Sequence, residues 1–281
     1  MYKMKHIKIS DKVVFGNDLP FVLIAGPCAL ESRDHAMFMA ENLTKITNKL
    51  GIPFVFKTSF DKANRTSISS KRGAGLDYSM KVFDEIREKI GCACITDIHL
   101  PDQAEIVAPH VDILQIPAFL ARQTDLLVSA AKTGKPINIK KPQWSAPHDM
   151  KSTLGKMYDS GNENILLCER GTSFGYNNYV VDMRSIPWMS SLGVPVVIDA
   201  THGIQQPASS GCTSGGDRRL APVIARAALA IGVAAVFTEV HDNPDSAPCD
   251  GPNMIKLSDM EKELKIWKQI DEIAKSNLII I

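Results

Sequence analysis

The sequence predicts an α/β protein, specifically a closed (β/α)8 barrel of the TIM type, on three observations. Eight short apolar runs alternate with segments of helical periodicity along the 281 residues. The runs are continuous, as in Val196-Val197-Ile198, which is typical of parallel strands covered on both faces. Each run ends in or just before a polar residue, and in a barrel all eight strand ends open at one face. We therefore expect residues 1–281 to form a single barrel domain.

The expected elements follow one another without a long linker. Residues 1–19 contain two short strands around Ser10-Asp11-Lys12, a β-hairpin suited to closing the bottom of the barrel. The eight strands are expected at 21–28, 53–59, 92–98, 113–118, 136–141, 165–171, 195–202 and 235–241. Helices are expected at 31–50, 77–90, 124–132 and 220–231, each followed within two residues by glycine. An open Rossmann sheet would need Gly-x-Gly-x-x-Gly after the first strand, where Gly26-Pro27-Cys28 stands instead.

Composition restricts the class of partner and the compartment. The net charge is +1, so no global field draws the chain to nucleic acid or to a membrane. No run approaches the length of a membrane-spanning helix, and the N-terminus lacks the apolar core of a signal peptide. The six cysteines do not form the pattern of a small secreted scaffold. We expect a cytoplasmic protein without a membrane or nucleic-acid partner.

Basic residues stand at several of the strand ends and in the loops that follow. They are Lys57, Lys62, Arg65, Arg122, Lys140 and Arg170. Cations that converge from separate loops suit phosphate or carboxylate ligands, because guanidinium groups grip such anions bidentately and ammonium groups supply point charge. Their number indicates more than one anionic group. Lys71 and Lys141 are expected instead to be solvated surface residues.

Soft and acidic donors follow the first, seventh and eighth strands, which are neighbours once a barrel closes. They are Cys28, His202, Glu239 and Asp250. A thiolate, an imidazole and two carboxylates can hold Zn, Fe or Mn. Their spacing is not that of a zinc finger, and a lone Cys or His is more often simply buried or hydrogen-bonded. The metal site is therefore predicted from barrel geometry alone.

Other features of the strand ends and loops complete the expected site. Asp97 is expected to be ionised beside the cations, and Gln115 to face a ligand hydroxyl. Cys92, Cys94 and Cys168 lie inside strands and are expected in the core. The long loops 203–219 and 240–255 are expected to be lids over the site, or else slack surface connections.

The motifs at these strand ends closely resemble those of the 3-deoxy-D-manno-octulosonate 8-phosphate synthases. The resemblance covers nearly the whole chain in order. Its segments are Ile24-Ala25-Gly26-Pro27-Cys28-Ala29-Leu30-Glu31-Ser32, Lys57-Thr58-Ser59-Phe60-Asp61-Lys62-Ala63-Asn64-Arg65-Thr66-Ser67, Thr96-Asp97-Ile98-His99, Leu114-Gln115-Ile116-Pro117-Ala118-Phe119-Leu120, Lys140-Lys141-Pro142-Gln143, Cys168-Glu169-Arg170-Gly171, Ala200-Thr201-His202 and Cys249-Asp250-Gly251-Pro252.

The resemblance implies a (β/α)8 barrel, usually a homotetramer, in the cytoplasmic pathway to lipopolysaccharide. Such enzymes condense phosphoenolpyruvate with arabinose 5-phosphate and water, releasing inorganic phosphate. By resemblance, Asp97 and Gln115 would line the pocket near the reacting end of the sugar, and Arg122 would reach toward a neighbouring subunit's site. Phosphoenolpyruvate would be surrounded by Lys57, Ser59, Lys62, Lys140 and Arg170, and the sugar phosphate held by Asn64, Arg65 and Thr66. The candidate catalytic residues are Lys57, Asp97, Lys140 and His202.

The family divides by metal use, and the two motifs that report on it point in different directions. Metal-dependent members carry Cys where Cys28 stands and counterparts of His202, Glu239 and Asp250. Metal-independent members carry Asn at the first of these positions. Cys28 therefore implies a divalent metal, whereas Cys249-Asp250-Gly251-Pro252 is more similar to the metal-independent pattern. Strict dependence on the metal is left open.

Three rival functions follow from the same residues. The sibling 3-deoxy-D-arabino-heptulosonate 7-phosphate synthases use erythrose 4-phosphate, but typically have Lys-Pro-Arg-Thr where this chain has Lys62-Ala63-Asn64-Arg65. A Schiff-base aldolase would use Lys140 or Lys57 as its nucleophile. A barrel that binds phosphosugars without turnover is disfavoured, because every candidate catalytic position holds a competent residue.

Overall fold

Eight parallel strands form a closed barrel in the computed structural model, which describes residues 5–65, 67–210 and 213–279. Neighbouring strands pair in chain order, and the pairs β11–β14 and β14–β3 close the ring. This confirms the predicted barrel and excludes an open sheet. The strands are β3 (Val22–Gly26), β4 (Phe54–Lys57), β5 (Ala93–Asp97), β6 (Ile113–Ile116), β7 (Ile137–Lys140), β8 (Ile165–Glu169), β11 (Val196–Asp199) and β14 (Ala235–His241).

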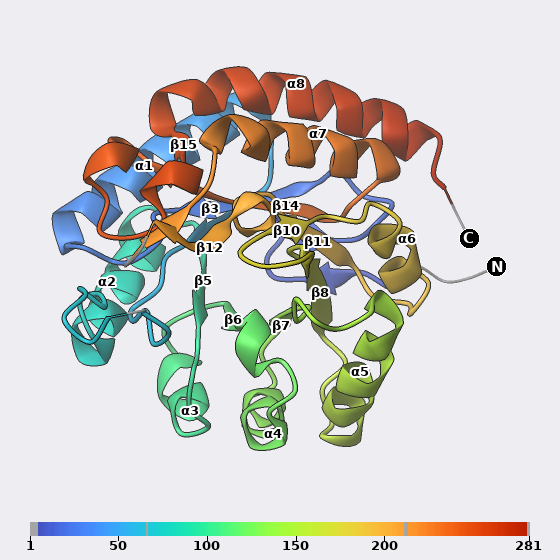
Figure 1. Cartoon of the computed structure of the whole chain (residues 1–281), viewed down its shortest axis with the longest axis horizontal. Helices are drawn as coiled ribbons and strands as arrows, with labels where there is room; N and C mark the ends of the chain where they lie inside the picture. Colours follow the sequence, from blue (N-terminus) through green and yellow to red (C-terminus); the bar gives the residue numbers. More distant parts are fainter. Residues whose placement is uncertain (1–4, 66, 211–212, 280–281) are drawn as a thin grey trace.

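Helices surround the barrel as an outer ring (Figure 1). They are α1 (Arg33–Leu50), α2 (Leu76–Lys89), α3 (Gln103–Val107), α4 (Thr124–Lys132), α5 (Met150–Asp159), α6 (Ser185–Ser190), α7 (Ala221–Ile231) and α8 (Leu257–Ser276). The first begins two residues later than predicted, because the Ser32 hydroxyl accepts the His35 amide N–H as an N-cap. It ends at Gly51, whose φ of 65° is the left-handed conformation that glycine adopts without strain.

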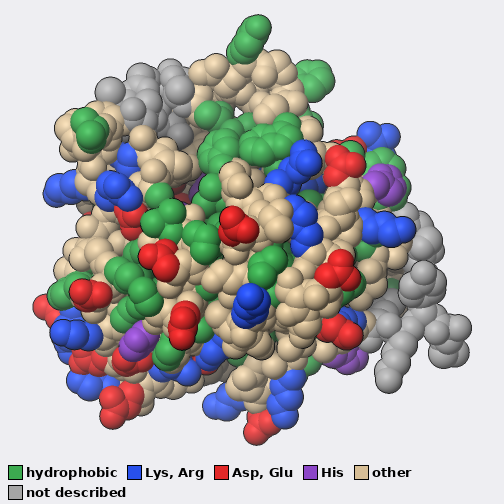
Figure 2. Space-filling model, turned by 90° about the horizontal axis from the view of Figure 1, so that it is seen from below, with side chains coloured by type: hydrophobic (Ala, Val, Ile, Leu, Met, Phe, Trp, Pro, Cys, Tyr) green, Lys and Arg blue, Asp and Glu red, His purple; other side chains and the backbone are tan. Residues whose placement is uncertain are grey.

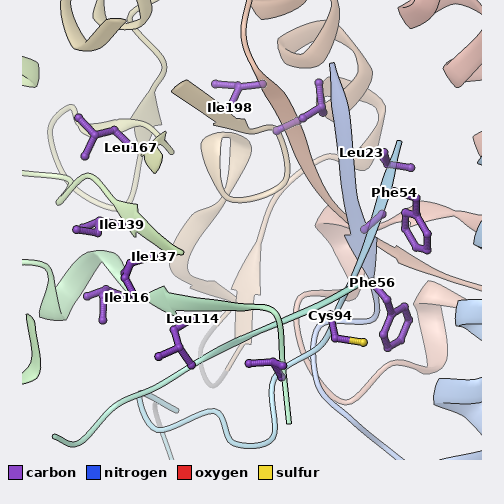
Figure 3. Packing of buried hydrophobic residues seen from close by; sticks show 14 of the residues in the cluster. Leu23, Phe54, Phe56, Cys94, Leu114, Ile116, Ile137, Ile139, Leu167 and Ile198 are labelled. Carbon is purple, nitrogen blue, oxygen red and sulfur yellow. The ribbon is translucent and has the colours of Figure 1, made fainter. Parts of the chain in front are cut away.

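The strands bury side chains on both faces, as the continuous apolar runs predict. One set packs outward against the helices (Figure 3). Its labelled members are Leu23, Phe54, Phe56, Cys94, Leu114, Ile116, Ile137, Ile139, Leu167 and Ile198. The alternate residues form a second cluster inside the barrel: Val22, Ile24, Val55, Ile95, Ile113, Leu166, Cys168, Val197, Ala235 and Phe237. Because side chains alternate along a strand, the next inward position on many strands is the polar residue at the strand's end.

The N-terminal hairpin covers the end of the barrel at which the strands begin. Strands β1 (Ile7–Lys8) and β2 (Val14–Phe15) pair antiparallel. Ile7, Val13 and Phe15 are buried in the same cluster as the inward residues of the barrel. The prediction of a hairpin that closes the bottom is confirmed, and the opposite end stays open.

Short secondary structure also lies in the connections. A hairpin of β9 (Thr172–Ser173) and β10 (Tyr179–Val180) follows β8, and a hairpin of β12 (Gln206–Ser210) and β13 (Thr213–Gly215) lies in the loop 203–219. Strand β15 (Ile255–Lys256) extends the sheet beside β14. The 3-10 helices are η1 (Ala118–Leu120), η2 (Pro147–Asp149), η3 (His202–Ile204), η4 (Arg218–Leu220), η5 (Pro244–Ser246) and η6 (Gly251–Asn253). Among the described helices, none is long and apolar enough to cross a membrane.

Candidate active site

A cavity of about 380 Å³ occupies the open end of the barrel, where the strands end. Most of the site residues predicted from the sequence line it: Lys57, Ser59, Lys62, Asn64, Arg65, Asp97, Gln115, Lys140, Arg170, His202 and Asp250. Cys28 and Glu239 are buried and contact members of this set. The predicted convergence of residues from all parts of the chain is therefore present in the structure.

Two lysines approach one buried carboxylate at the base of the cavity. Lys57 Nζ donates to Glu239 Oε1 at 3.1 Å and to the Cys28 carbonyl at 3.2 Å. Lys62 Nζ lies 3.7 Å from the same Glu239 oxygen. Burial alone would raise the pKa of Glu239, but the neighbouring cations, Lys57 first, lower it to about 2. Burial would likewise lower the pKa of Lys62, yet the surrounding thiol and carboxyl groups raise it above its ordinary value. Both groups are therefore charged at neutral pH.

The guanidinium groups of Arg170 and Arg65 each have a hydrogen-bond donor that is available to a ligand. Arg170 lies 4.5 Å over the Tyr179 ring, and its Nη2 lies 3.4 Å from Gln205 Oε1. Arg65 Nη2 donates to the Pro248 carbonyl at 3.3 Å. Within the part of the chain that the structure describes, the buried atoms Arg170 Nη1 and Arg65 Nε have no hydrogen-bond partner. Unpaired guanidinium donors at a cavity are suited to anionic oxygens, which would satisfy them.

Asp97 is ionised, as the sequence predicts. Its Oδ2 lies 2.9 Å from His99 Nε2. Burial would raise the pKa of Asp97, but the hydrogen bond from His99 and the charges of Lys62 and Lys57 hold it well below its ordinary value. Gln115, its neighbour across the β5–β6 pair, accepts a hydrogen bond from Asn138 Nδ2 at 3.0 Å. The two side chains give the cavity one anionic and one neutral polar wall.

The predicted metal donors lie together. Ligand atoms of His202, Glu239 and Asp250 are within 4.8 Å of one another, as are those of Cys28, Cys249 and Asp250. Cys28 Sγ lies 3.2 Å from Asp250 Oδ2. Glu239 Oε2 is buried and without a hydrogen-bond partner among the residues described. The donor set of thiol, imidazole and two carboxylates, with this unpaired oxygen, fits a divalent transition metal.

One residue central to this arrangement is absent from the sequence prediction. Asp199, the last residue of β11, is fully buried, and its Oδ2 lies 2.6 Å from Lys140 Nζ and 2.7 Å from His202 Nδ1. The neighbouring His202 and the Lys140 ammonium group hold the pKa of Asp199 well below its ordinary value against the effect of burial. With Nδ1 donating to Asp199, His202 presents Nε2 toward Glu239 Oε1, 3.7 Å away. The position of Asp199 at the end of a strand is the signal that could have identified it as a site residue.

Two further residues that line the cavity were not predicted as site residues from the sequence. Cys249 Sγ lies 2.7 Å from Cys28 Sγ, so the second thiol adjoins the predicted donors. Gln205 Nε2 donates to Asp250 Oδ1 at 2.8 Å. Both lie in loops. There, neither a strand end nor an apolar periodicity indicates which way a side chain points. Cys92, Cys94 and Cys168 are buried, as predicted.

The prediction for Lys141 is wrong. Its side chain is completely buried, and Nζ lies 3.7 Å from Glu169 Oε1. Nζ also donates to the Pro142 carbonyl and to Thr172 Oγ1, both at 3.2 Å. Because the strand alternates, Lys141 points away from the barrel interior that Lys140 enters, but the loops around β8 cover it. Lys71 is exposed, as predicted.

One predicted substrate residue does not line the cavity, and another lies outside the described residues. Arg122 is exposed and does not line it; its backbone carbonyl accepts a hydrogen bond from Lys156. An exposed position is compatible with the predicted contact to a neighbouring subunit. Thr66 lies outside the described residues, as do the last two residues of the apolar tail 278–281.

The chain is similar to named proteins along nearly its whole length. Residues 4–276 match the model of the DAHP synthetase I family. The chain is 57% identical over 265 residues to the 2-dehydro-3-deoxyphosphooctonate aldolase of a Chelativorans species, covering 94% of this chain and 96% of that protein. It is 55% identical over 267 residues to the protein of that name from Agrobacterium fabrum and 53% over 266 residues to that from Bartonella henselae, each match covering 95% of both chains.

These identities extend through every strand of the barrel. They agree with the resemblance in the strand-end motifs, since 2-dehydro-3-deoxyphosphooctonate aldolase is another name for the synthases that those motifs indicate. The chain therefore belongs to the DAHP synthetase I family and, within it, to the 2-dehydro-3-deoxyphosphooctonate aldolases.

Proposed function

We propose that the protein condenses phosphoenolpyruvate with D-arabinose 5-phosphate and water, giving 3-deoxy-D-manno-octulosonate 8-phosphate and inorganic phosphate for lipopolysaccharide biosynthesis. The observation that carries this proposal is the cation-lined cavity of a chain whose relatives share one enzyme name. Two phosphorylated substrates would repel one another in water. Lys57, Lys62, Lys140 and Arg170 offset that repulsion and convert a two-substrate encounter into a positioned one.

The burial of each residue supports assigning the two substrates to different parts of the cavity. The buried Lys57, Ser59, Lys140 and Arg170, with Lys62, would hold phosphoenolpyruvate at the base. Asn64 and Arg65, in the loop after β4, would hold the sugar phosphate nearer the mouth, and Thr66 belongs to this proposed group. The methylene carbon of phosphoenolpyruvate attacks the sugar aldehyde while water adds to the adjacent carbon. Phosphate then leaves by carbon–oxygen cleavage, and Asp97, His202 and Gln115 orient the aldehyde and the water.

We assign Cys28, His202, Glu239 and Asp250 as ligands of a divalent ion, Zn, Fe or Mn. Such an ion would supply a Lewis acid for the aldehyde or lower the pKa of a bound water. Asp199 supports this assignment, because a carboxylate on the far nitrogen of a ligating histidine fixes its tautomer and orientation. Whether turnover requires the ion is decided by the chelator arm of the experiment below.

The assembled enzyme is proposed to be a cytoplasmic homotetramer in which residues 1–281 form one domain. Arg122, exposed beside the cavity loops, would then reach a neighbouring subunit's site. On the face shown in Figure 2, hydrophobic side chains gather near the upper edge, beside Lys and Arg side chains. A reducing compartment is supported by Cys28, Cys92, Cys94, Cys168 and Cys249, which are free thiols.

Release of inorganic phosphate from phosphoenolpyruvate tests the function directly. We expect release with arabinose 5-phosphate and at least tenfold less with erythrose 4-phosphate, each measured with and without chelator. Lys57→Met should abolish release, whereas Lys71→Met, at an exposed lysine, should leave it unchanged. Faster release with erythrose 4-phosphate would reassign the chain to the seven-carbon sugar. A covalent adduct after borohydride treatment with substrate would instead show a Schiff base.

A further inference from the structure

Two histidines and two carboxylates gather outside the active-site cavity, where α1 meets the end of β14. Glu31 and His35 flank the start of α1, His241 is the last residue of β14, and Asp242 follows it. Ligand atoms of Glu31, His35 and His241 lie within 4.8 Å of one another. None of these four residues lines the cavity. The cluster therefore needs a separate explanation.

One carboxylate lies close to both imidazole rings. Asp242 Oδ1 lies 3.0 Å from His35 Nε2 and 3.0 Å from His241 Nδ1. The opposite nitrogens, His35 Nδ1 and His241 Nε2, lie 3.9 Å and 2.8 Å from Glu31 Oε1. Both rings thus direct their second nitrogen toward the same oxygen. A ligating histidine usually has this arrangement, with a carboxylate behind one nitrogen and the metal at the other.

The nitrogen of His35 that faces Glu31 is unsatisfied. His35 Nδ1 is buried and has no hydrogen-bond partner among the residues that the structure places. Its separation of 3.9 Å from Glu31 Oε1 is too long for a hydrogen bond, and an orphaned buried polar atom is costly. Two imidazole nitrogens and one carboxylate oxygen form a donor set that binds Zn²⁺. An ion between them would satisfy this nitrogen.

We propose that Glu31, His35 and His241 form a second divalent metal site, selective for Zn²⁺ and similar ions such as Co²⁺, with Asp242 as its supporting carboxylate. The site ties α1 to β14 beside the pair β14–β3 that closes the barrel. Its role is structural, because no group of the site enters the active-site cavity. The proposal does not depend on the proposed reaction.

The cluster also has an ion-free form. The Asn243 amide N–H lies 2.9 Å from His241 Nδ1, which favours a proton on Nε2 and a hydrogen bond to Glu31. Binding of an ion displaces the Nε2 proton. A proton on Nδ1 then faces Asp242, and the Asn243 N–H has to turn away from Nδ1 to another acceptor. The ion-free form leaves His35 Nδ1 without a hydrogen-bond partner, whereas in the ion-bound form this nitrogen binds the ion. The two forms differ in metal content, so counting ions distinguishes them.

Metal stoichiometry of the full, untagged chain tests the site. The protein is stripped with chelator, equilibrated with buffered Zn²⁺ and measured by elemental analysis. We expect two ions per chain, one in Cys28→Ala, one in His35→Gln and none in the double variant. The control His110→Gln, which removes a surface histidine paired with Asp84 at 2.8 Å, should keep two. Metal content unchanged by His35→Gln, or no ion in Cys28→Ala, would overturn the proposal.

Cobalt substitution separates the two sites spectroscopically. A thiolate ligand gives Co²⁺ an intense charge-transfer band, whereas nitrogen and oxygen ligands give only weak d–d bands. In Cys28→Ala we expect d–d bands alone, and His35→Gln in that background should abolish them. If the active-site ligands hold no ion, the unmodified chain binds a single Co²⁺ that only His35→Gln removes. Saturating Zn²⁺ should also raise the Tm of Cys28→Ala and not that of the double variant. A Cys28→Ala protein without Co²⁺ bands and without a Zn²⁺-dependent Tm contradicts the site.

Discussion

Asp199 is a buried carboxylate that positions two candidate catalytic groups at once. It contacts Lys140 Nζ at 2.6 Å and His202 Nδ1 at 2.7 Å. In Asp199→Asn the amide cannot neutralise Lys140 and no longer fixes the His202 tautomer. We expect kcat for phosphate release to fall about 10–100-fold, as for other supporting carboxylates of ligating histidines.

The matched control for this change is Asp84→Asn. Asp84 also pairs with a histidine, His110, at 2.8 Å, but on the surface. Its kcat should remain that of the unmodified protein. Circular dichroism of both variants establishes that they fold. An Asp199→Asn protein with normal kcat would show that this carboxylate does not position the catalytic groups.

Replacement of Cys28 distinguishes two roles for the metal. If the ion mainly orients the reacting atoms, Cys28→Asn should retain activity after complete removal of metal, because the amide can still hydrogen-bond in its place. Cys28→Ala should lose activity, since it offers neither ligand nor hydrogen bond. Steady-state rates of phosphate release, with metal content measured on the same samples, test this. Loss of activity in both variants would indicate that the ion's charge is essential.

At the scale of elements, the contact between β3 and β4 depends on the absence of a side chain at Gly26. A Cβ there would lie 2.0 Å from the Lys57 carbonyl oxygen, which belongs to backbone and cannot move aside cheaply. Gly26→Ala should therefore separate the two strands where Cys28 and Lys57 enter the site. We expect a loss of about 1–3 kcal/mol in the free energy of unfolding, typical of overpacking, together with a lower kcat/KM. Urea denaturation and phosphate release measure the two effects.

The helical glycine Gly155 provides the control. It lies in α5, and a Cβ there would meet no atom within 4 Å. Because alanine favours helix, Gly155→Ala should stabilise the protein by about 0.5–1 kcal/mol and leave activity unchanged. A Gly26→Ala protein as stable and active as Gly155→Ala would contradict the close-contact argument.

Elements with strong periodicity and clear ends were predictable from the sequence. The helix Thr124–Lys132 has the predicted bounds, and β14 ends at His241 as predicted. Most strands are shorter than their apolar runs, because the last residues of a run leave the ladder to enter the cavity loops. The hairpin of β12 and β13 gave no apolar signal, since its residues, such as Gln206 and Ser210, are polar. Such pairing depends on tertiary contacts rather than on local pattern.

At the scale of the whole molecule, the Lys141–Glu169 pair makes stability depend on pH. Burial lowers the pKa of Lys141 from its ordinary value of 10.5, although Glu169 opposes this shift. Between the lowered pKa and 10.5 the unfolded chain binds more protons than the folded chain. The contribution of Lys141 to stability therefore rises with pH across that window. In Lys141→Met this rise should be absent, which urea denaturation at a series of alkaline pH values up to 10.5 would reveal.

The same variant tests the pair at neutral pH. Lys141→Met leaves the buried Glu169 side chain without its cationic partner, which we expect to cost about 3 kcal/mol in unfolding free energy. Lys141→Met combined with Glu169→Gln should recover part of this loss, because the unpaired carboxyl group is then absent. A single variant as stable as the double one would show that the two groups are not coupled.

The position of the site was predictable because the fold dictates it, but the contacts within it were not. Closed-barrel geometry sufficed to bring Lys57, Arg170 and His202 to one mouth. Sequence could not show that Asp199 joins Lys140 to His202, since the direction of a side chain depends on strand register and twist. Nor could it show that Lys141 is covered by loops. Buried networks of this kind are decided by three-dimensional packing.

The closure of the barrel through β14 and β3 has a consequence for the order in which the protein is made. Cys28 and Asp250, whose side chains lie 3.2 Å apart, are separated by 222 positions in the chain. A ribosome must therefore finish almost the entire polypeptide before the proposed ligands can meet. Products released early carry Cys28 and Lys57 without Glu239 or Asp250, and thus have no complete site at which to capture an ion.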